Sequence, residues 1–235
     1  MADWAFNLAC CCCPVGFDVG AWPGIQGCIC ENPIVYLRDD ISRIVDCKAV
    51  FCGPSSVCGG AMKFKPEQYS AIKDWVENGG RLWCNGEYNQ DGDGYDCLGD
   101  EARDKINSFM SALGCSMQVG HHACNCGCLD PEGNPWLGIN GAAKIVTTPT
   151  SLPGVYHACV GEVTGGTTIN RARPMQDNQG GNSPACLSSY PWIAIEQVGQ
   201  GVVVLTGDSD VFDGCGHDNC EIAKRFINNE PEDLI

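Results

Sequence analysis

Short apolar runs alternate with amphipathic segments along the first half of the chain, and this pattern predicts strands and helices in turn. Residues 34–37 and 44–51 are apolar runs of strand length, and the second is rich in β-branched residues. Residues 81–86 predict the next strand. Strands that alternate with helices typically form a parallel sheet with helices on its faces.

Helices are predicted between these strands. Pro66 suits the first position of a helix whose apolar face continues until Gly79 and Gly80 end it. Residues 101–113 repeat the helical pattern, and Gly114 ends it. A last helix is expected over residues 219–227, with an inward face of Ile222, Ala223, Phe226 and Ile227.

The second half of the chain is richer in strands. Strands are predicted over residues 116–119, 144–147, 155–163, 192–198 and 202–205. Residues 120–141 form an insertion that lacks periodicity and is rich in Cys, His, Gly and Pro. The whole pattern predicts one α/β domain over residues 33–235, with a mixed, largely parallel sheet, after a Cys-rich N-terminal arm over residues 1–32.

The charge balance excludes two classes of partner. The 235 residues include 14 Lys and Arg against 29 Asp and Glu, a formal net charge of −15. Such a surface repels phosphate backbones and anionic lipids, so nucleic-acid binding is not expected. No apolar run reaches about 18 residues, so no membrane insertion is expected either.

The chain contains 19 cysteines, although it is long enough to fold without the support of disulfide bonds. Its N-terminus lacks the basic and apolar regions of a secretory signal peptide. We therefore expect a protein that reaches an oxidising extracellular or virion environment without one. The arm and loops hold the disulfide candidates Cys10, Cys11, Cys12, Cys13, Cys28, Cys30, Cys124, Cys126, Cys128, Cys215 and Cys220. The odd total leaves at least one cysteine for a bond between subunits.

One block of sequence carries a family resemblance. The segment Trp75-Val-Glu-Asn-Gly-Gly-Arg-Leu-Trp83 resembles a helix-to-strand step of the class I glutamine amidotransferase-like superfamily, especially its ThuA-type branch. Residues 106–114 are similar to the next helix of that group, and residues 199–212 and 219–228 to its closing strand and helix. The resemblance implies a flavodoxin-like three-layer sandwich. Many members of this branch are non-catalytic binding or scaffold domains, so it implies a fold more firmly than an activity.

The same resemblance implies three candidate catalytic residues. Amidotransferases place a nucleophilic Cys on the turn after a strand and activate it with a His that a Glu orients. The candidates here are Cys84, His217 and Glu221. Counted from Gly80, the turn falls near Gly86, which leaves Cys84 inside the strand. A buried or disulfide-bonded Cys84 is therefore favoured over a nucleophile.

An acidic loop follows this strand. Oxygen ligands recur there at the spacing of a calcium loop, with Gly94 at the sharp bend. The ligand candidates are Asn89, Asp91, Asp93, the Tyr95 carbonyl and Asp100. Because Asp in place of Glu at the last position shortens the bidentate reach, a solvated acidic turn is the alternative to a Ca²⁺ site.

Two other groups of ligand-type residues have plainer interpretations. A soft-ligand cluster comprises His121, His122, Cys124, Cys126 and Cys128. Its alternating spacing points neighbouring sulfurs in different directions, so disulfides are favoured over zinc. Asp208 and Asp210 follow the strand predicted at 202–205, where they either bind a polar ligand or satisfy the backbone of a tight turn.

These features predict a non-enzymatic structural component of a large extracellular assembly, foremost a phage virion protein of the capsid-decoration or tail and neck type. Intra- and intersubunit disulfides would stabilise it, and its partners would be copies of itself and other subunits. The alternatives are a Cys-dependent amidase or hydrolase that uses Cys84, and a secreted calcium- or glycan-binding module.

Overall fold

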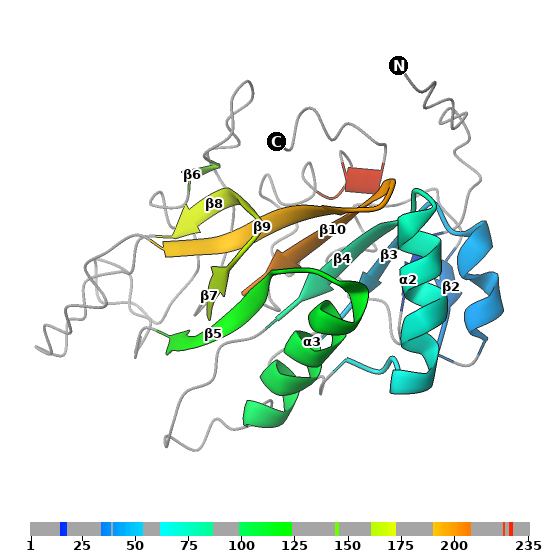
Figure 1. Cartoon of the computed structure of the whole chain (residues 1–235), viewed down its shortest axis with the longest axis horizontal. Coiled ribbons are helices and arrows are strands. Elements are labelled where there is room, and N and C mark those ends of the chain that lie inside the picture. Colours follow the sequence, from blue (N-terminus) through cyan, green and yellow to red (C-terminus); the bar gives the residue numbers. More distant parts are fainter. Residues whose placement is uncertain are drawn as a thin grey trace, which may run out of the picture.

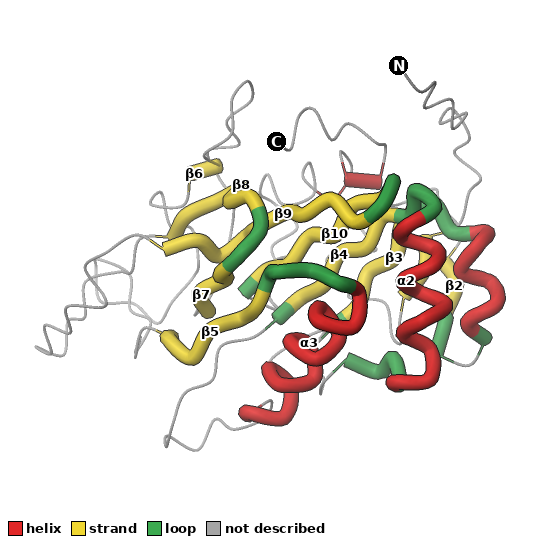
Figure 2. The backbone as a smooth tube through the Cα atoms, viewed as in Figure 1, coloured by secondary structure: helices red, strands yellow, loops and turns green. Residues whose placement is uncertain are grey.

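The computed structural model describes residues 15–17, 34–38, 40–53, 62–86, 99–123, 144–145, 161–172, 190–207, 223 and 226–227 (Figures 1 and 2). The strands of its eight-stranded central sheet, in spatial order, are β2 (Ile34–Tyr36), β1 (Val15–Phe17), β3 (Ala49–Cys52), β4 (Arg81–Asn85), β10 (Gly201–Thr206), β9 (Tyr190–Val198), β8 (Thr167–Ala172) and β6 (Lys144–Ile145). A separate two-stranded sheet pairs β5 (Gln118–Ala123) with β7 (Gly161–Thr164).

Strand pairing in the central sheet changes from parallel to antiparallel at β10. Strands β2, β1, β3, β4 and β10 pair in parallel, whereas β10, β9, β8 and β6 pair antiparallel. The predicted mixed α/β class is therefore confirmed, with parallel pairing confined to one half of the sheet. This half contains β4, the strand that carries Cys84.

Helices cover one face of the parallel half (Figure 1). A 3-10 helix, η1 (Ile41–Asp46), precedes β3, and a second, η2 (Pro66–Gln68), leads directly into α2 (Tyr69–Glu77). The longest helix, α3 (Gly99–Leu113), follows β4. Pro66 opens the helical segment as predicted, because its fixed φ and missing N–H are tolerated there.

Helices α2 and α3 each end in a turn that needs glycine. Gly79 has a φ of 105°, and the Gly80 N–H donates to the Trp75 carbonyl at 3.0 Å. Gly114 has a φ of 86°, and the Cys115 N–H donates to the Met110 carbonyl at 3.0 Å. These bonds satisfy the last helical carbonyls in the manner of a Schellman motif. The two predicted helix ends are confirmed.

The core lies between the sheet and these helices. Alternate residues of the parallel strands point toward α2 and α3. The sheet contributes Val50, Cys52, Leu82, Cys84, Val203 and Leu205, and the helices contribute Ile72, Val76, Ile106, Phe109, Met110 and Leu113. All of these are completely buried. The opposite face holds a second packed group that includes Phe51, Trp83 and Phe226, with Phe226 at 5.2 Å between ring centroids from Trp83.

One predicted strand is divided. The sequence predicts a continuous strand over residues 44–51, but the first residues of this run belong to η1, and β3 begins at Ala49. The Asp40 carboxylate accepts a hydrogen bond from the Ser42 N–H at 3.1 Å and caps this short helix, while Ile44 is buried. The strand prediction is wrong there because a cap and one buried residue favour a helical turn.

Other elements also differ in extent from the prediction. Val15–Phe17 belong to the predicted N-terminal arm, yet they form β1 between β2 and β3, so the arm contributes a strand to the central sheet. Strand β5 extends to Ala123, into the stretch without periodicity, and β8 is not predicted at all. Of the final helix, Ala223, Phe226 and Ile227 are described as helical and are buried as expected. Ile222 lies outside the described residues.

Candidate functional site

The carboxyl ends of β3, β4 and β10 are the place where a parallel α/β sheet usually binds its ligand. These three strands are neighbours, and Cys52 and Cys84 are register partners, as are Cys84 and Leu205. Residues from distant parts of the sequence, Cys52, Cys84 and Leu205, are therefore brought to one edge. This edge, formed by the residues that end each strand, is the candidate site.

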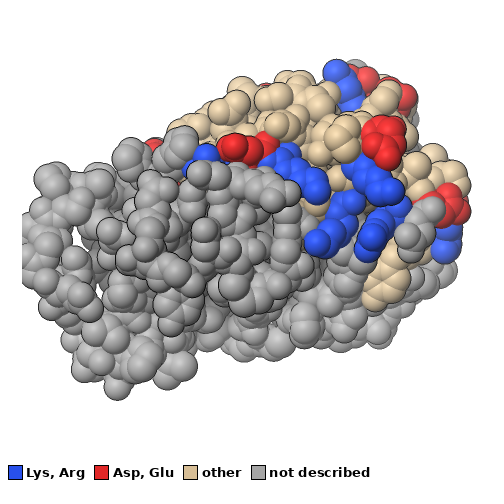
Figure 3. Space-filling model, turned by 90° about the horizontal axis from the view of Figure 1, so that it is seen from below, with Lys and Arg blue, Asp and Glu red and all other residues tan. Residues whose placement is uncertain are grey.

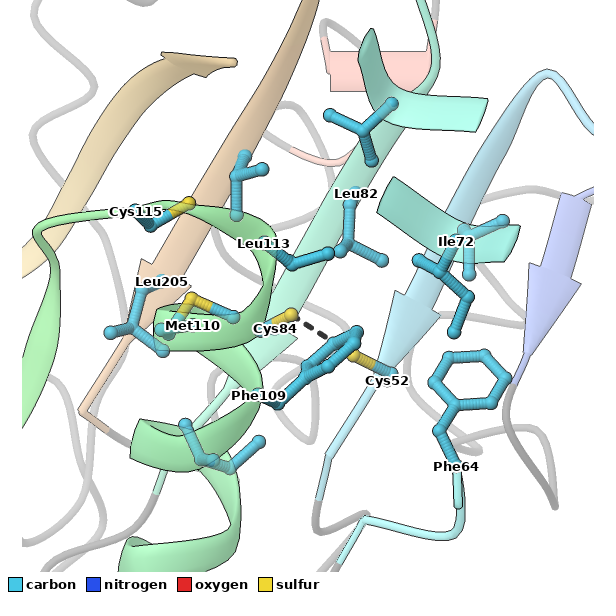
Figure 4. Close-up of a cluster of buried hydrophobic side chains, with 14 of the residues drawn as sticks. Cys52, Phe64, Ile72, Leu82, Cys84, Phe109, Met110, Leu113, Cys115 and Leu205 are labelled. Carbon is cyan, nitrogen blue, oxygen red and sulfur yellow. Dashed lines mark hydrogen bonds between the residues drawn. The ribbon is translucent and has the colours of Figure 1, made fainter. Parts of the chain in front are cut away.

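Cys84 lies inside β4 and is completely buried. It points to the helix-covered face, together with Leu82, because alternate strand residues share a face. Its Sγ atom lies 3.0 Å from the Sγ atom of Cys52 on β3, and Phe109 and Met110 of α3 pack beside this pair (Figure 4). This position gives the thiol an apolar surrounding and no contact with solvent.

Asn85 accepts hydrogen bonds from two side chains at the end of β4, on the other face of the sheet. Its Oδ1 accepts hydrogen bonds from Trp83 Nε1 and from Thr206 Oγ1, both at 3.0 Å. The Gly86 N–H donates to the Thr206 carbonyl at 2.6 Å, which ties the ends of β4 and β10 together. Asn85 and Thr206 are completely buried, so these bonds satisfy groups that have lost their water.

Two glycines allow the strand ends to pack closely. Gly53 has a φ of 119°, and a Cβ there would overlap the Asn85 carbonyl. A Cβ at Gly86 would overlap the Val119 side chain and approach the Thr206 carbonyl. The backbone at this edge is therefore filled by protein atoms, and a larger residue at either position requires a shift of the strands.

Apart from Asp100, the other predicted site residues lie outside the described residues. The segments that follow β3, β4 and β10 are outside the described residues, and with them the candidates His217, Glu221, Asp208 and Asp210. The same holds for Asn89, Asp91, Asp93 and Tyr95 of the acidic loop. Asp100 lies in the first turn of α3, with its side chain undescribed. Among the described residues, no group of three or more His, Cys, Asp or Glu is arranged to hold a metal ion.

The cysteines also fall into two groups, those outside the described residues and those within them. All eleven disulfide candidates lie outside the described residues. The described cysteines, Cys47, Cys52, Cys84 and Cys115, are buried and not disulfide-bonded. Burial raises the pKa of Cys47 and of Cys115 to about 12, with Asp46 adding to the effect for Cys47 and Glu196 for Cys115. Both thiols stay protonated at neutral pH and are poor nucleophiles.

Two charged side chains, those of Arg81 and Arg103, are only 5% exposed, and no sequence pattern predicts the burial of either. Arg81 opens β4 and is 5% exposed, and none of its three guanidinium nitrogens has a hydrogen-bond partner within the described part of the chain. The guanidinium carbon lies 5.2 Å from the centroid of the Phe226 ring, and burial lowers the Arg81 pKa to about 10. An Arg at the start of an apolar run normally indicates a solvent-exposed strand end, so the sequence carries no signal for this burial.

Two described segments of the family resemblance, residues 75–83 and 199–207 (the two resemblance blocks), contact each other at the opposite, amino edge of the sheet. The Gln200 N–H donates to the Glu77 carbonyl at 2.9 Å, and the Val202 N–H donates to the Gly80 carbonyl at 3.1 Å. A Cβ at Gly201 would overlap the Val76 carbonyl. The glycines of both blocks thus serve the packing of the β9–β10 turn against the end of α2, far from the candidate site.

The sequence matches no protein-family model and no curated protein. Solved structures share its fold. The structure titled "mmIFT52 N-terminal domain" has a TM-score of 0.59 and 10% identity over 92% of this chain and 97% of its own. A cytoplasmic protein from Salmonella typhimurium has a TM-score of 0.51 and 11% identity over 92% of this chain and 98% of its own.

A polyextremophilic β-galactosidase from the haloarchaeon Halorubrum lacusprofundi has a TM-score of 0.53 and 13% identity over 92% of this chain. The match spans only 30% of the β-galactosidase chain. At these identities the likeness establishes the α/β fold alone. The same fold thus makes up nearly all of two matched chains and a minor part of a third.

Proposed function

We propose that this chain is a non-catalytic member of the amidotransferase-like group that serves as a structural subunit of a disulfide-stabilised extracellular assembly. A phage virion is the proposed setting. Other copies of the chain and other subunits of the assembly are the proposed partners. Calcium at the acidic loop is proposed as an ion that stabilises the subunit rather than takes part in a reaction.

The observation that carries the proposal is the position of Cys84. A catalytic cysteine must reach substrate and must be held as a thiolate by a base or a positive dipole. Cys84 is completely buried, lies within the strand and has a second sulfur at 3.0 Å. These surroundings favour packing and oxidation over attack on an amide.

The fold comparisons support a modular role. The fold occupies nearly the whole of two matched chains and 30% of a β-galactosidase chain. A fold that is found both as nearly a whole matched chain and as a minor part of another is compatible with a modular, non-catalytic role. The contact between the two resemblance blocks supports the same interpretation, because their glycines are explained by packing alone.

The distribution of charge supports self-association. The whole chain carries 29 Asp and Glu against 14 Lys and Arg. Figure 3 shows Lys and Arg side chains gathered on one face of the described part. A locally basic face on a chain with a formal net charge of −15 is complementary to acidic side chains of a neighbouring copy.

The direct test compares the oligomeric state of the full chain before and after reduction. The protein is refolded in a glutathione redox buffer and examined by non-reducing electrophoresis and light scattering. We expect covalent species larger than the 25.1 kDa chain that disappear on reduction. A 25.1 kDa monomer in which all 19 cysteines react as thiols would contradict the proposal.

A second experiment tests the catalytic alternative. Ammonia release from glutamine is measured for the wild type, Cys84→Ser and the matched variant Cys115→Ser, which also alters a buried thiol. We expect the three proteins to be equally inactive. Hydrolysis that is lost in Cys84→Ser and retained in Cys115→Ser would establish an enzyme and overturn the structural role.

A further inference from the structure

Cys52 and Cys84 face each other across two neighbouring strands of the core. They are register partners in the parallel pair β3 and β4, so their side chains leave the sheet on the same face. Their Sγ atoms are 3.0 Å apart, and each residue is completely buried (Figure 4). The two cysteines are separated by 31 residues in the sequence, and although a disulfide-bonded Cys84 is one of the sequence-based expectations, no sequence pattern identifies Cys52 as its partner.

We propose that Cys52 and Cys84 form an oxidisable pair that closes to an intramolecular disulfide, which bonds β3 to β4 within the core. Neighbouring strands lie about 4.8 Å apart, which falls inside the Cα separation of about 4.4–6.8 Å that disulfides require. The two sulfurs already point toward each other, so closure needs only small side-chain rotations. The pair is therefore a modification site, and this inference does not depend on the proposed function.

The reaction needs an oxidant, and a low-molecular-weight disulfide such as oxidised glutathione is sufficient. One cysteine loses its proton, and its thiolate attacks the small disulfide, which forms a mixed disulfide and releases one small thiolate. The thiolate of the second cysteine then attacks the sulfur of the first and expels the other small thiolate. Two protein thiols are oxidised to one disulfide, one small disulfide is reduced to two thiolates, and these take up the two protons.

Burial sets when this reaction can occur. Phe109 and Met110 of α3 pack over the pair, and neither sulfur reaches solvent in the folded chain. The first exchange step must therefore take place during folding or in a local opening of α3. Once closed, the bond is shielded from reductants by the same side chains.

The other two described cysteines are not in a comparable position. The Cys47 thiol donates a hydrogen bond to the Arg43 carbonyl at 3.5 Å, before β3 begins. Cys115 follows α3, and Figure 4 shows its sulfur apart from the dashed contact between Cys52 and Cys84. Among the described cysteines, the strand pair alone has two sulfurs in contact, and this makes Cys47 and Cys115 internal controls.

The test is a disulfide map of the refolded full chain. Protein oxidised in glutathione buffer is trapped with N-ethylmaleimide in guanidinium and digested with trypsin. The relevant peptides are residues 49–63 and 82–103, because the chain has basic residues at Lys48, Lys63, Arg81 and Arg103. Each peptide also contains a second cysteine, Cys58 or Cys97, so the map is made in a Cys58→Ser/Cys97→Ser background as well as in the wild type.

We expect the two peptides to be joined, with a mass two hydrogens below their sum and with no maleimide on Cys52 or Cys84. In the same background, the Cys115→Ala variant should keep the link between the two peptides. In the Cys52→Ala variant, peptide 82–103 should be recovered on its own, without peptide 49–63 attached. Reduction by dithiothreitol should be about tenfold slower or more in the native protein than in guanidinium. Maleimide on both residues in the oxidised native protein, or a bond from either to another cysteine, would overturn the proposal.

Discussion

The two faces of β4 are built from the same five-residue strand, yet they differ in chemistry. On one face Leu82 and Cys84 lie in an apolar layer under α2 and α3, which also contains the sulfur atoms of Cys52 and Met110. On the other face Trp83 and Asn85 take part in hydrogen bonds, and Arg81 is buried against Phe226. Because successive side chains of a strand point to opposite faces of the sheet, β4 has one sulfur-rich face and one hydrogen-bonded face.

This difference indicates which changes each face tolerates. The sulfur-rich face depends on packing and can be altered covalently by oxidation. The hydrogen-bonded face depends on the pairing of buried polar groups. Removal of one partner therefore leaves a buried donor with neither a protein acceptor nor water to bond to. Substitutions that perturb one face at a time test, by the size of their effects on stability, whether the two faces are distinct.

The largest effect is expected from Trp83→Ala. Trp83 is completely buried and stacks on Phe51 at 6.1 Å between ring centroids, so its loss leaves a large cavity. We expect a loss of about 3–5 kcal/mol in the free energy of unfolding, measured by urea denaturation of the reduced protein. Leu82→Ala, on the opposite face, should cost about 2–5 kcal/mol. A cost below about 1 kcal/mol for either variant would show that its face is not part of the core.

The next effect is expected from Asn85→Leu. The substitution leaves the Trp83 Nε1–H and the Thr206 hydroxyl without their common acceptor. The expected cost is about 2–4 kcal/mol, because each buried donor that loses its partner costs about 1–3 kcal/mol. In Asn85→Leu/Thr206→Val the hydroxyl is also absent, so the double variant should cost less than the sum of the single ones. Additive single costs would contradict a shared acceptor.

Arg81→Met is expected to stabilise the protein slightly or to leave its stability unchanged. The buried guanidinium lacks an acceptor within the described residues, and its contact with the Phe226 ring offsets only part of the desolvation cost. Met keeps the apolar stem, so we expect a gain of about 0–2 kcal/mol in urea denaturation. If the variant is destabilised by more than about 1 kcal/mol, the guanidinium is paired in solution and the contrast between the faces is weaker than described.

The smallest effect concerns the buried thiols at alkaline pH. The pKa of Cys115 is raised from 9.0 to about 12, so above pH 9 the unfolded chain loses this proton while the folded protein keeps it. The contribution of the neutral thiol is complete below pH 9 and is lost as the pH rises toward 12. Cys115→Ala should therefore lessen the alkaline decline by up to about 1 kcal/mol per pH unit, measured between pH 8 and 11 in reducing buffer. An unchanged decline, equal to that of the exposed control Ser111→Ala, would contradict the assignment.

Local signals predict much of the fold. Pro66 and Gly79–Gly80 bound one helix, and Gly114 ends another, because their backbone requirements are readable one residue at a time. The division of residues 44–51 is not predicted, since β-branched residues favour a strand and the Asp40 cap decides otherwise. Strand β1 is missed because three residues between cysteines and glycines carry too little periodicity.

The candidate site is predicted only in part. The spacing from Gly80 places Cys84 inside the strand, as the structure has it. Its contact with Cys52 depends on the register of β3 against β4, which no local pattern encodes. The burial of Arg81 depends on Phe226, which is 145 positions away in the sequence. Contacts of this kind follow from the topology and not from any motif.

The central claim is that Cys84 is a residue of the core and not a nucleophile, and thiol labelling of the native, reduced protein tests it directly. The full chain is exposed to N-ethylmaleimide at neutral pH, and the labelling rate of each cysteine is followed by mass spectrometry against the guanidinium-unfolded protein. We predict that Cys52 and Cys84 are labelled about 10³-fold more slowly than in the unfolded chain, because only opening of the core exposes them. Labelling of native Cys84 within about tenfold of the unfolded rate would contradict the account.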